Sequence, residues 1–107
     1  MIGKEMIGKY VVVRGDRSGI FAGTLKEKEQ KQNGYASVIL TDCRRLWQWS
    51  GACSISQIAI DGTKEPNNCK FTVTVDSIEL SDAIEIIPCT ERATEIIKGV
   101  AVWKIKS

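Results

Sequence analysis

Histidine is absent from the 107 residues of the chain. Without an imidazole, the sequence excludes a Ser-His-Asp or Cys-His catalytic arrangement, a histidine general base and a histidine-ligated metal. An enzyme with this sequence would have to use carboxylates, lysine or thiolates alone. The composition therefore favours a binding protein that has no catalytic residues, no metal and no cofactor.

Long hydrophobic segments are also absent. The longest uninterrupted apolar runs have four residues, at positions 10–13 and 100–103. A transmembrane helix and the core of a signal peptide both need longer runs. We therefore expect a protein without a membrane partner, located in the cytoplasm of the host cell in which it is made.

Closely spaced cysteines are missing as well. The four cysteines stand at positions 43, 53, 69 and 89, and no Cys-x-x-Cys occurs. Zinc sites nearly always contain a close pair, and disulfides are rare in the cytoplasm. We therefore predict four small, mostly buried thiols that hold no metal.

A large net charge is lacking too, since the chain carries only +2. The charge is uneven, with a balance of +4 over residues 1–53 and of −2 over residues 54–107. A protein that wraps duplex nucleic acid needs many phosphate contacts and hence a stronger basic excess. The sequence therefore points away from a duplex and allows one small anionic ligand.

The length and composition, with 43% hydrophobic and 26% charged residues, fit one globular domain. The opening Met-Ile-Gly-Lys is repeated from Met6, which makes Met6 an alternative start to Met1. We therefore expect an N-terminal extension at residues 1–5 and a single domain at residues 6–107.

The hydrophobic pattern predicts an α+β fold, with six to seven short strands in a small, mostly antiparallel β-sheet or barrel and with two short helices. The helices are expected to begin after the caps Ser54 and Thr90 and to end at Gly62 and Gly99. Expected strands are 9–14, 20–29, 35–41, 71–75, 77–80 and 83–87, while 43–49 either continues the third strand or forms another after a kink at residue 42.

Two arginines and two tryptophans lie within the seven residues 43–49. If this segment is a strand, Arg45, Trp47 and Trp49 share one face, and Arg44 lies on the other. A guanidinium beside indoles binds phosphate and provides a stacking surface for a nucleobase. Tryptophans of a small protein often belong to the core instead, and the sequence leaves open which arginine faces the ligand.

The neighbouring sequence adds further candidates. Ser54 and Gln57 match a capping box at a helix N-terminus, which favours anions, and Arg14 precedes a glycine-rich turn at residues 15–19. The candidate ligand-binding residues are therefore Arg14, Arg44, Arg45, Trp47, Trp49, Ser54 and Gln57.

The run Arg-Arg-Leu-Trp-Gln-Trp-Ser-Gly-Ala at 44–52, followed by Ser-Ile-Ser-Gln-Ile-Ala at 54–59, resembles a family of small uncharacterised proteins from tailed phages and prophages. Residues 7–14 and 83–90 resemble it too, so that the likeness covers about residues 6–104. In that family a tyrosine often stands where this chain has Gln48. A looser likeness, in size and Arg/Trp content, is to phage anti-defence "sponges", compact homo-oligomers that sequester nucleotide signals without cleaving them.

The resemblance implies a phage-encoded, non-enzymatic anti-defence protein that sequesters a cyclic oligonucleotide or a cyclic ADP-ribose signal. Two alternatives use the same residues: an inhibitor that binds a host defence enzyme, and a single-stranded nucleic-acid-binding protein. We also expect a homo-oligomer, a dimer or a multiple of it, because three tryptophans and many isolated Ile and Val residues exceed what so small a fold covers.

Overall fold

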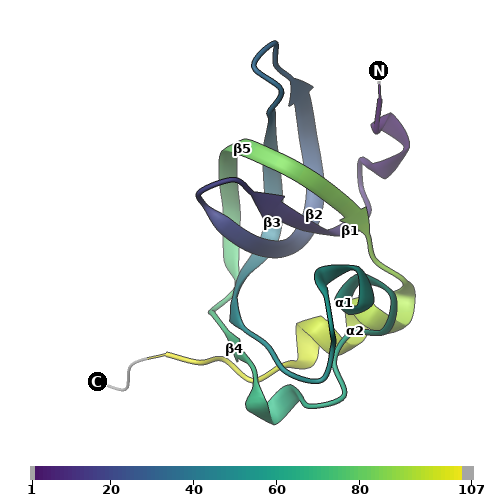
Figure 1. The fold of residues 1–107 in the computed structure, drawn as a ribbon, viewed down its shortest axis with the longest axis vertical. Helices are drawn as coiled ribbons and strands as arrows, with labels where there is room; N and C mark the ends of the chain where they lie inside the picture. Colours follow the sequence, from purple (N-terminus) through teal and green to yellow (C-terminus); the bar gives the residue numbers. More distant parts are fainter. Residues whose placement is uncertain (1, 105–107) are drawn as a thin grey trace.

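The computed structural model describes residues 2–104 and shows a curled antiparallel sheet with two helices packed together on one side of it (Figure 1). Residue 1 and residues 105–107, which belong to the expected extension and domain, lie outside the described residues. The elements in chain order are η1 (Lys4–Met6), β1 (Tyr10–Gly15), β2 (Gly19–Gln30), β3 (Ala36–Gln48), α1 (Ile55–Asp61), η2 (Pro66–Asn68), β4 (Lys70–Phe71), β5 (Val75–Pro88) and α2 (Glu91–Gly99). Between residues 2 and 104, neither helix has the length and apolar character that crossing a membrane requires.

The sheet has five strands in the order β2-β1-β5-β3-β4, with a further pairing between β2 and β3. The short strand β1 pairs with only part of β2, up to Thr24, and with only the end of β5, from Ala83 onward. The sheet therefore curls around its core without closing into a barrel along its length. The predicted α+β class with an antiparallel sheet is confirmed, whereas the predicted six to seven strands and the barrel are corrected to a curled sheet of five.

The strand count differs because an expected boundary between two strands is not there. The predicted turn between strands 77–80 and 83–87 lies inside the continuous strand β5, where the backbone runs on through Asp82. The expected strand 71–75 is also wrong, because only Lys70 and Phe71 pair with β3 as β4, and the chain then joins β5 at Val75. Local alternation in the sequence did not show which partner each segment would find.

Strand β3 continues past the expected kink. Asp42 has a φ of 48°, a left-handed conformation that is uncommon outside glycine, and β3 resumes at Cys43. Residues 43–48 are therefore a continuation of the third strand, one of the two predicted alternatives.

Both helices form where their caps predict. The hydroxyl oxygens of Ser54 and Thr90 accept hydrogen bonds from backbone N–H groups three residues further on, at 3.2 and 3.1 Å. Gly62 ends α1 with a φ of 71°, and a Cβ there would lie 2.8 Å from the side chain of Ile96 in α2. Glycine thus allows both the turn and the close contact between the helices.

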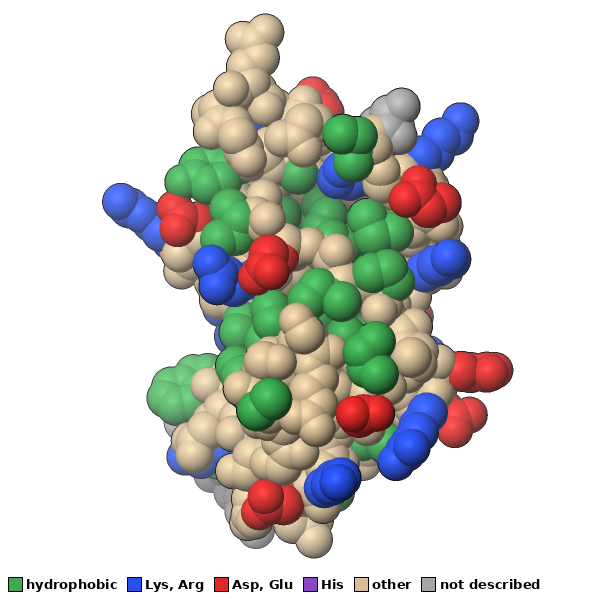
Figure 2. All heavy atoms as spheres, turned by 45° about the vertical axis from the view of Figure 1, so that its right-hand side comes forward, with side chains coloured by type: hydrophobic (Ala, Val, Ile, Leu, Met, Phe, Trp, Pro, Cys, Tyr) green, Lys and Arg blue, Asp and Glu red, His purple; other side chains and the backbone are tan. Residues whose placement is uncertain are grey.

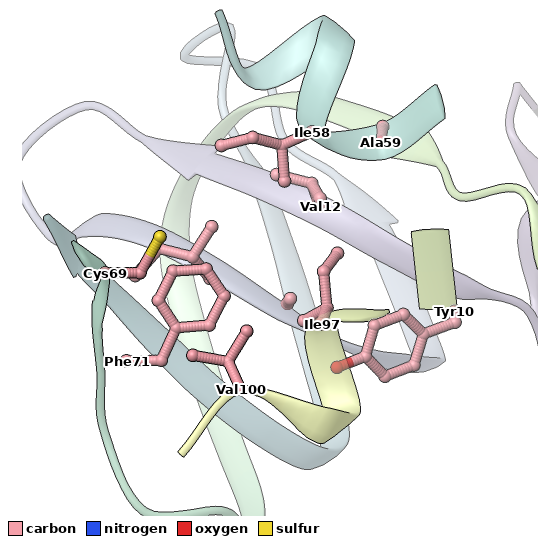
Figure 3. Close-up of a cluster of buried hydrophobic side chains, with 10 residues drawn as sticks. Tyr10, Val12, Ile58, Ala59, Cys69, Phe71, Ile97 and Val100 are labelled. Carbon is pink, nitrogen blue, oxygen red and sulfur yellow. The ribbon is translucent and has the colours of Figure 1, made fainter. Parts of the chain in front are cut away.

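The curled sheet separates two hydrophobic cores. One lies within the curl and contains Phe21, Leu25 and Leu40, all fully buried. The other lies between the outer side of the sheet and the two helices, where Val12, Ile58, Phe71 and Ile97 point toward one another (Figure 3). Because β3 lines both cores, successive residues of this strand face different surroundings.

Asp82 connects the middle of β5 to the turn between β1 and β2. Its carboxylate accepts hydrogen bonds from Arg17 N (2.8 Å), Ser18 N (3.0 Å) and Ser18 Oγ (2.7 Å). The backbone N–H of Arg17, and then the bonds from Ser18, favour the ionised carboxylate and hold the pKa of Asp82 below its ordinary value.

We predict that Asp82→Ala lowers the free energy of unfolding at pH 7 by about 1 to 2 kcal/mol, because three donors lose their acceptor. The native pKa lies below the unfolded value of about 3.9, so this stability is present above that value and is lost as the pH falls through the native pKa. Urea denaturation across pH 7 to 2 measures the difference. Asp76→Ala, at an exposed position of the same strand, is the control; an equal loss in both variants would contradict the prediction.

Candidate functional site

Arg44 is buried, with 2% of its surface exposed. Its Nε donates to Thr72 O (2.9 Å), its Nη1 to Ile97 O (2.8 Å) and its Nη2 to Phe71 O (3.4 Å). The guanidinium also lies 5.4 Å from the ring centroid of Phe71, and burial lowers the pKa of Arg44. The structure therefore places this candidate inside the protein, where it joins β3 to the segment from β4 and to the last turn of α2.

Arg45 and Trp47 face the solvent on the other side of β3, with the buried Leu46 between them. Arg45 Nη1 donates to Ser18 O at 2.6 Å, and the guanidinium lies 4.5 Å from the ring centroid of Phe21. The indole of Trp47 is 60% exposed. The predicted alternation therefore holds for residues 44–47, and Arg45 is the arginine that faces outward.

Trp49 does not share this surface. It is partly buried and packs against the core below the helices, on the side of Leu46. The pairing between β3 and β4 shifts register between Leu46 and Gln48, and a shift of this kind breaks the simple alternation of faces. The prediction that Trp47 and Trp49 share one face is thereby corrected.

Two residues that the sequence analysis did not select complete the surface around Trp47. The ring centroids of Trp47 and Trp103 lie 5.7 Å apart with an angle of 34° between the ring planes. Lys70 Nζ lies 5.8 Å from the Trp47 centroid and 5.0 Å from the Trp103 centroid. We refer to Arg45, Trp47, Lys70 and Trp103 as the tryptophan surface.

Trp103 reaches this position because the chain after α2 runs beside β4. Val102 forms a parallel bridge with Phe71, and Trp103 N donates to Phe71 O at 2.9 Å. The apolar run at residues 100–103 indicated that the C-terminal segment packs against the rest of the protein. It did not indicate which element the segment contacts. Lys70 comes close because it lies opposite Gln48 in the pairing of β4 with β3.

The two cations of the tryptophan surface have no acidic partner. Among residues 2–104, the ion pair within 4.0 Å is that of Arg14 Nε with Glu85 Oε1, at 3.4 Å. Lys70 therefore keeps its positive charge beside two exposed indoles, while the guanidinium of Arg45 lies against Ser18 and Phe21. An anion that carries an aromatic ring matches this arrangement.

Two cavities lie away from the tryptophan surface. A cavity of about 200 Å³ is lined by residues of β2, β3 and β5 around Ile39, and another of about 170 Å³ by residues around Met6 and Ile84. Neither is lined by a residue of the tryptophan surface.

Hydrophobic side chains also gather in the middle of the face that Figure 2 shows, with charged side chains at its margin.

The other three candidates are engaged in local structure. Arg14 pairs with Glu85, and the N–H groups of the turn after it are bound by the carboxylate of Asp82. Ser54 Oγ accepts from Gln57 N as predicted, but Gln57 Oε1 accepts from Cys53 N at 2.8 Å, one residue before the cap, so the return bond of the predicted capping box is shifted by one residue. In the described part of the chain, none of the three forms a hydrogen bond or ion pair with the tryptophan surface.

The burial of the cysteines matches the prediction with one exception. Cys43 and Cys69 are buried and Cys89 is partly buried, and burial raises the pKa of the Cys43 and Cys89 thiols to about 12. Cys53, however, is exposed. Within residues 2–104, no three Cys, Asp or Glu side chains come together as a metal site would require.

Residues 8–97 match the family model described as Domain of unknown function (DUF6948). No curated protein and no solved structure matches the chain. The matched segment contains Arg45, Trp47 and Lys70, whereas Trp103 follows it.

The contrast between the two adjacent arginines gives a stability prediction. Arg44→Ala should lower the free energy of unfolding by about 3 kcal/mol or more, since three buried carbonyls lose their donors and a cavity remains. Arg45→Ala should cost less than about 1 kcal/mol, as exposed substitutions usually do. Urea denaturation followed by circular dichroism measures both, and an Arg45→Ala variant that is the less stable of the two would refute the assigned faces.

The exposure of the cysteines predicts their reactivity. In the native protein, one thiol per chain should react rapidly with a disulfide reagent, and Cys53→Ser should abolish this rapid phase. The remaining thiols should react only after addition of denaturant. A rapid phase that survives in Cys53→Ser would show that a second thiol is accessible.

Proposed function

The chain belongs to this family, a domain of unknown function (DUF6948), and from its tryptophan surface we propose that it is a non-enzymatic nucleotide-binding protein. The base of the ligand stacks on the indoles of Trp47 and Trp103, and its phosphate lies against Arg45 and Lys70. As the biological setting we propose phage infection, in which the protein sequesters a cyclic oligonucleotide or cyclic ADP-ribose immune signal in the host cytoplasm.

The observation that carries the proposal is the ammonium of Lys70 beside two exposed indoles, with Arg45 exposed on the same face of β3 as Trp47. Trp47 is 60% and Trp103 44% exposed, whereas most large apolar side chains of the sheet are buried. Stacking on such rings contributes about 1–3 kcal/mol per base, and a guanidinium or ammonium adds charge-assisted hydrogen bonds to phosphate. Sequestration requires these contacts and no proton transfer.

Sequestration of a signal requires a low dissociation constant, and hence a large binding free energy from the site. A dissociation constant of 1 nM corresponds to about −12.3 kcal/mol. Two stacked bases at about 1–3 kcal/mol each, with two solvent-exposed phosphate contacts, fall short of this once the entropy lost on association is included. The tryptophan surface of one chain therefore explains recognition of the ligand but not its tight retention.

A protein partner is the second candidate function. Tryptophan and arginine dominate the energetics of protein interfaces, and Trp47 and Trp103 are exposed. An inhibitor of a host enzyme would use the same residues. The nucleotide is preferred because neither Arg45 nor Lys70 has an acidic partner within 4.0 Å among residues 2–104, and a small ligand with a phosphate and a base matches a cation beside aromatic rings.

The test is a thermal-shift measurement with cyclic di- and trinucleotides and cyclic ADP-ribose isomers. A ligand at about 100 times its dissociation constant should add about 2.7 kcal/mol of stability and raise the melting temperature by several degrees. Trp47→Ala and Lys70→Glu should lose this shift, whereas Trp47→Phe should retain part of it because a phenyl ring still stacks.

Lys64→Glu is the matched control for Lys70→Glu, since it makes the same change of charge at an exposed loop position. Its thermal shift should equal that of the unmodified protein. If no nucleotide of the panel shifts the melting temperature while Trp47→Ala abolishes binding to a host enzyme, the protein-inhibitor function replaces the nucleotide proposal.

A further inference from the structure

The first half of β5 is an edge of the sheet. Residues 75–83 pair with β3 on one side, and β1 joins the other side only from Ala83 onward. Along residues 75–81, which we refer to as the β5 edge, this second side has no strand partner among residues 2–104. Figure 1 shows this part of β5 at the margin of the sheet, beyond β3. Every second residue of the β5 edge therefore directs its N–H and C=O groups away from β3.

The chain itself adds a segment to the same margin of the sheet at β4. Strands β4 and β5 pair with successive parts of β3, at residues 46–48 and 36–43, so that β4 continues the line of β5 (Figure 1). At β4 the outer side is occupied, because Val102 forms a parallel bridge with Phe71 and Trp103 N donates to Phe71 O at 2.9 Å. An extended segment thus fits this margin at β4, whereas the adjoining β5 edge is left unpaired.

Acidic side chains mark the β5 edge and the face of the sheet beside it. Asp76 and Glu79 are exposed on the edge, and Glu79 lies opposite Ile39 of β3, which lies opposite Glu27 of β2. The cavity of about 200 Å³ around Ile39 is lined by Glu27, Glu29 and Glu79. In the described part of the chain, none of these carboxylates has an ion-pair partner within 4.0 Å. An unpaired edge therefore adjoins a hollow that has a half-buried isoleucine and acidic sides.

Charge decides what kind of segment the β5 edge accepts. Lys28 also lines the cavity, but its Nζ donates to Ile2 O at 2.8 Å, and three carboxylates beside one ammonium leave the cavity negative. A second copy paired through the same edge would bring Asp76 and Glu79 close to their equivalents, and like charges in a strand pair are destabilising. A segment that carries lysine or arginine matches the edge instead.

We propose that the β5 edge binds an extended, basic segment of a partner protein, which adds a strand to the sheet through main-chain hydrogen bonds. Side chains of that segment on the same face as Glu79 lie next to the cavity. A lysine or arginine there directs its alkyl stem toward Ile39 and its charge toward the glutamates. The β5 edge shares no residue with the tryptophan surface, and the proposal is independent of nucleotide binding.

The experiment uses the full chain, isotope-labelled for nuclear magnetic resonance, and a blocked peptide of about eight residues in which lysine and valine alternate. The peptide should shift the amide resonances of residues 75–81 and slow the hydrogen exchange of every second amide there. Two further peptides separate the two contributions to binding. Glutamate in place of lysine reverses the charge, and N-methylation of every second residue removes the main-chain donors of one edge, so neither peptide should bind measurably.

Variants separate the β5 edge from the rest of the surface. Glu79→Lys should weaken binding of the lysine–valine peptide about tenfold, because a repulsive charge replaces an attractive one beside the added strand. Glu95→Lys makes the same change at an exposed position on α2 and is the matched control, which should bind as the unmodified protein does. Trp47→Ala should also leave peptide binding unchanged. Circular dichroism verifies that each variant is folded.

Three results would overturn the proposal. The first is the absence of resonance shifts at residues 75–81 when the lysine–valine peptide is added. The second is equal binding of the N-methylated peptide, which would reveal attraction between charges without strand pairing. The third is slow exchange of the same amides in the peptide-free protein together with a doubled mass, which would make a second copy the occupant of the β5 edge.

Discussion

The buried guanidinium of Arg44 is the interaction on which the arrangement of the second half of the chain depends. It donates to main-chain carbonyls of Phe71 and Thr72 and to Ile97 O in the last turn of α2, where a cation also interacts favourably with the helix dipole. A single side chain on β3 thus fixes β4 and α2. Lys70 directly precedes this anchored segment, and the bridge to Val102 starts from it. The outward tryptophan surface is held in place by an arginine that faces inward.

Sequence reasoning succeeded where the deciding interactions are local. The caps Ser54 and Thr90 and the stop at Gly62 set the helices, and alternation along β3 separated Arg44 from Arg45. It failed where contacts with a distant segment of the chain determine the local structure. Asp82 reads locally as a turn residue, yet the donors that its carboxylate binds lie 64 and 65 positions earlier in the chain, and β5 runs straight through it.

The candidate site was found only in part for the same reason. Arg45 and Trp47 lie close in sequence, and the high content of arginine and tryptophan at residues 43–49 identified them as candidates. Lys70 and Trp103 join them only through the pairing of β4 with β3 and of the segment after α2 with Phe71. The local spacing at 43–49 could not indicate that Trp49 turns toward the helices and that Trp103 takes the place beside Trp47.

Lys70 already occupies the surface that a ligand would use. Its ammonium lies 5.0 and 5.8 Å from the two indole centroids and covers part of the rings by cation–π attraction, worth about 0.5–1 kcal/mol at an exposed site. In the free protein this side chain therefore shields two exposed aromatic rings that would otherwise promote aggregation. An incoming aromatic group has to displace it, so a neutral aromatic compound loses the attraction that it breaks. A ligand that also carries a negative charge recovers it, because the displaced ammonium pairs with that charge. Under the proposed function, Lys70 would therefore favour aromatic anions over uncharged aromatic molecules.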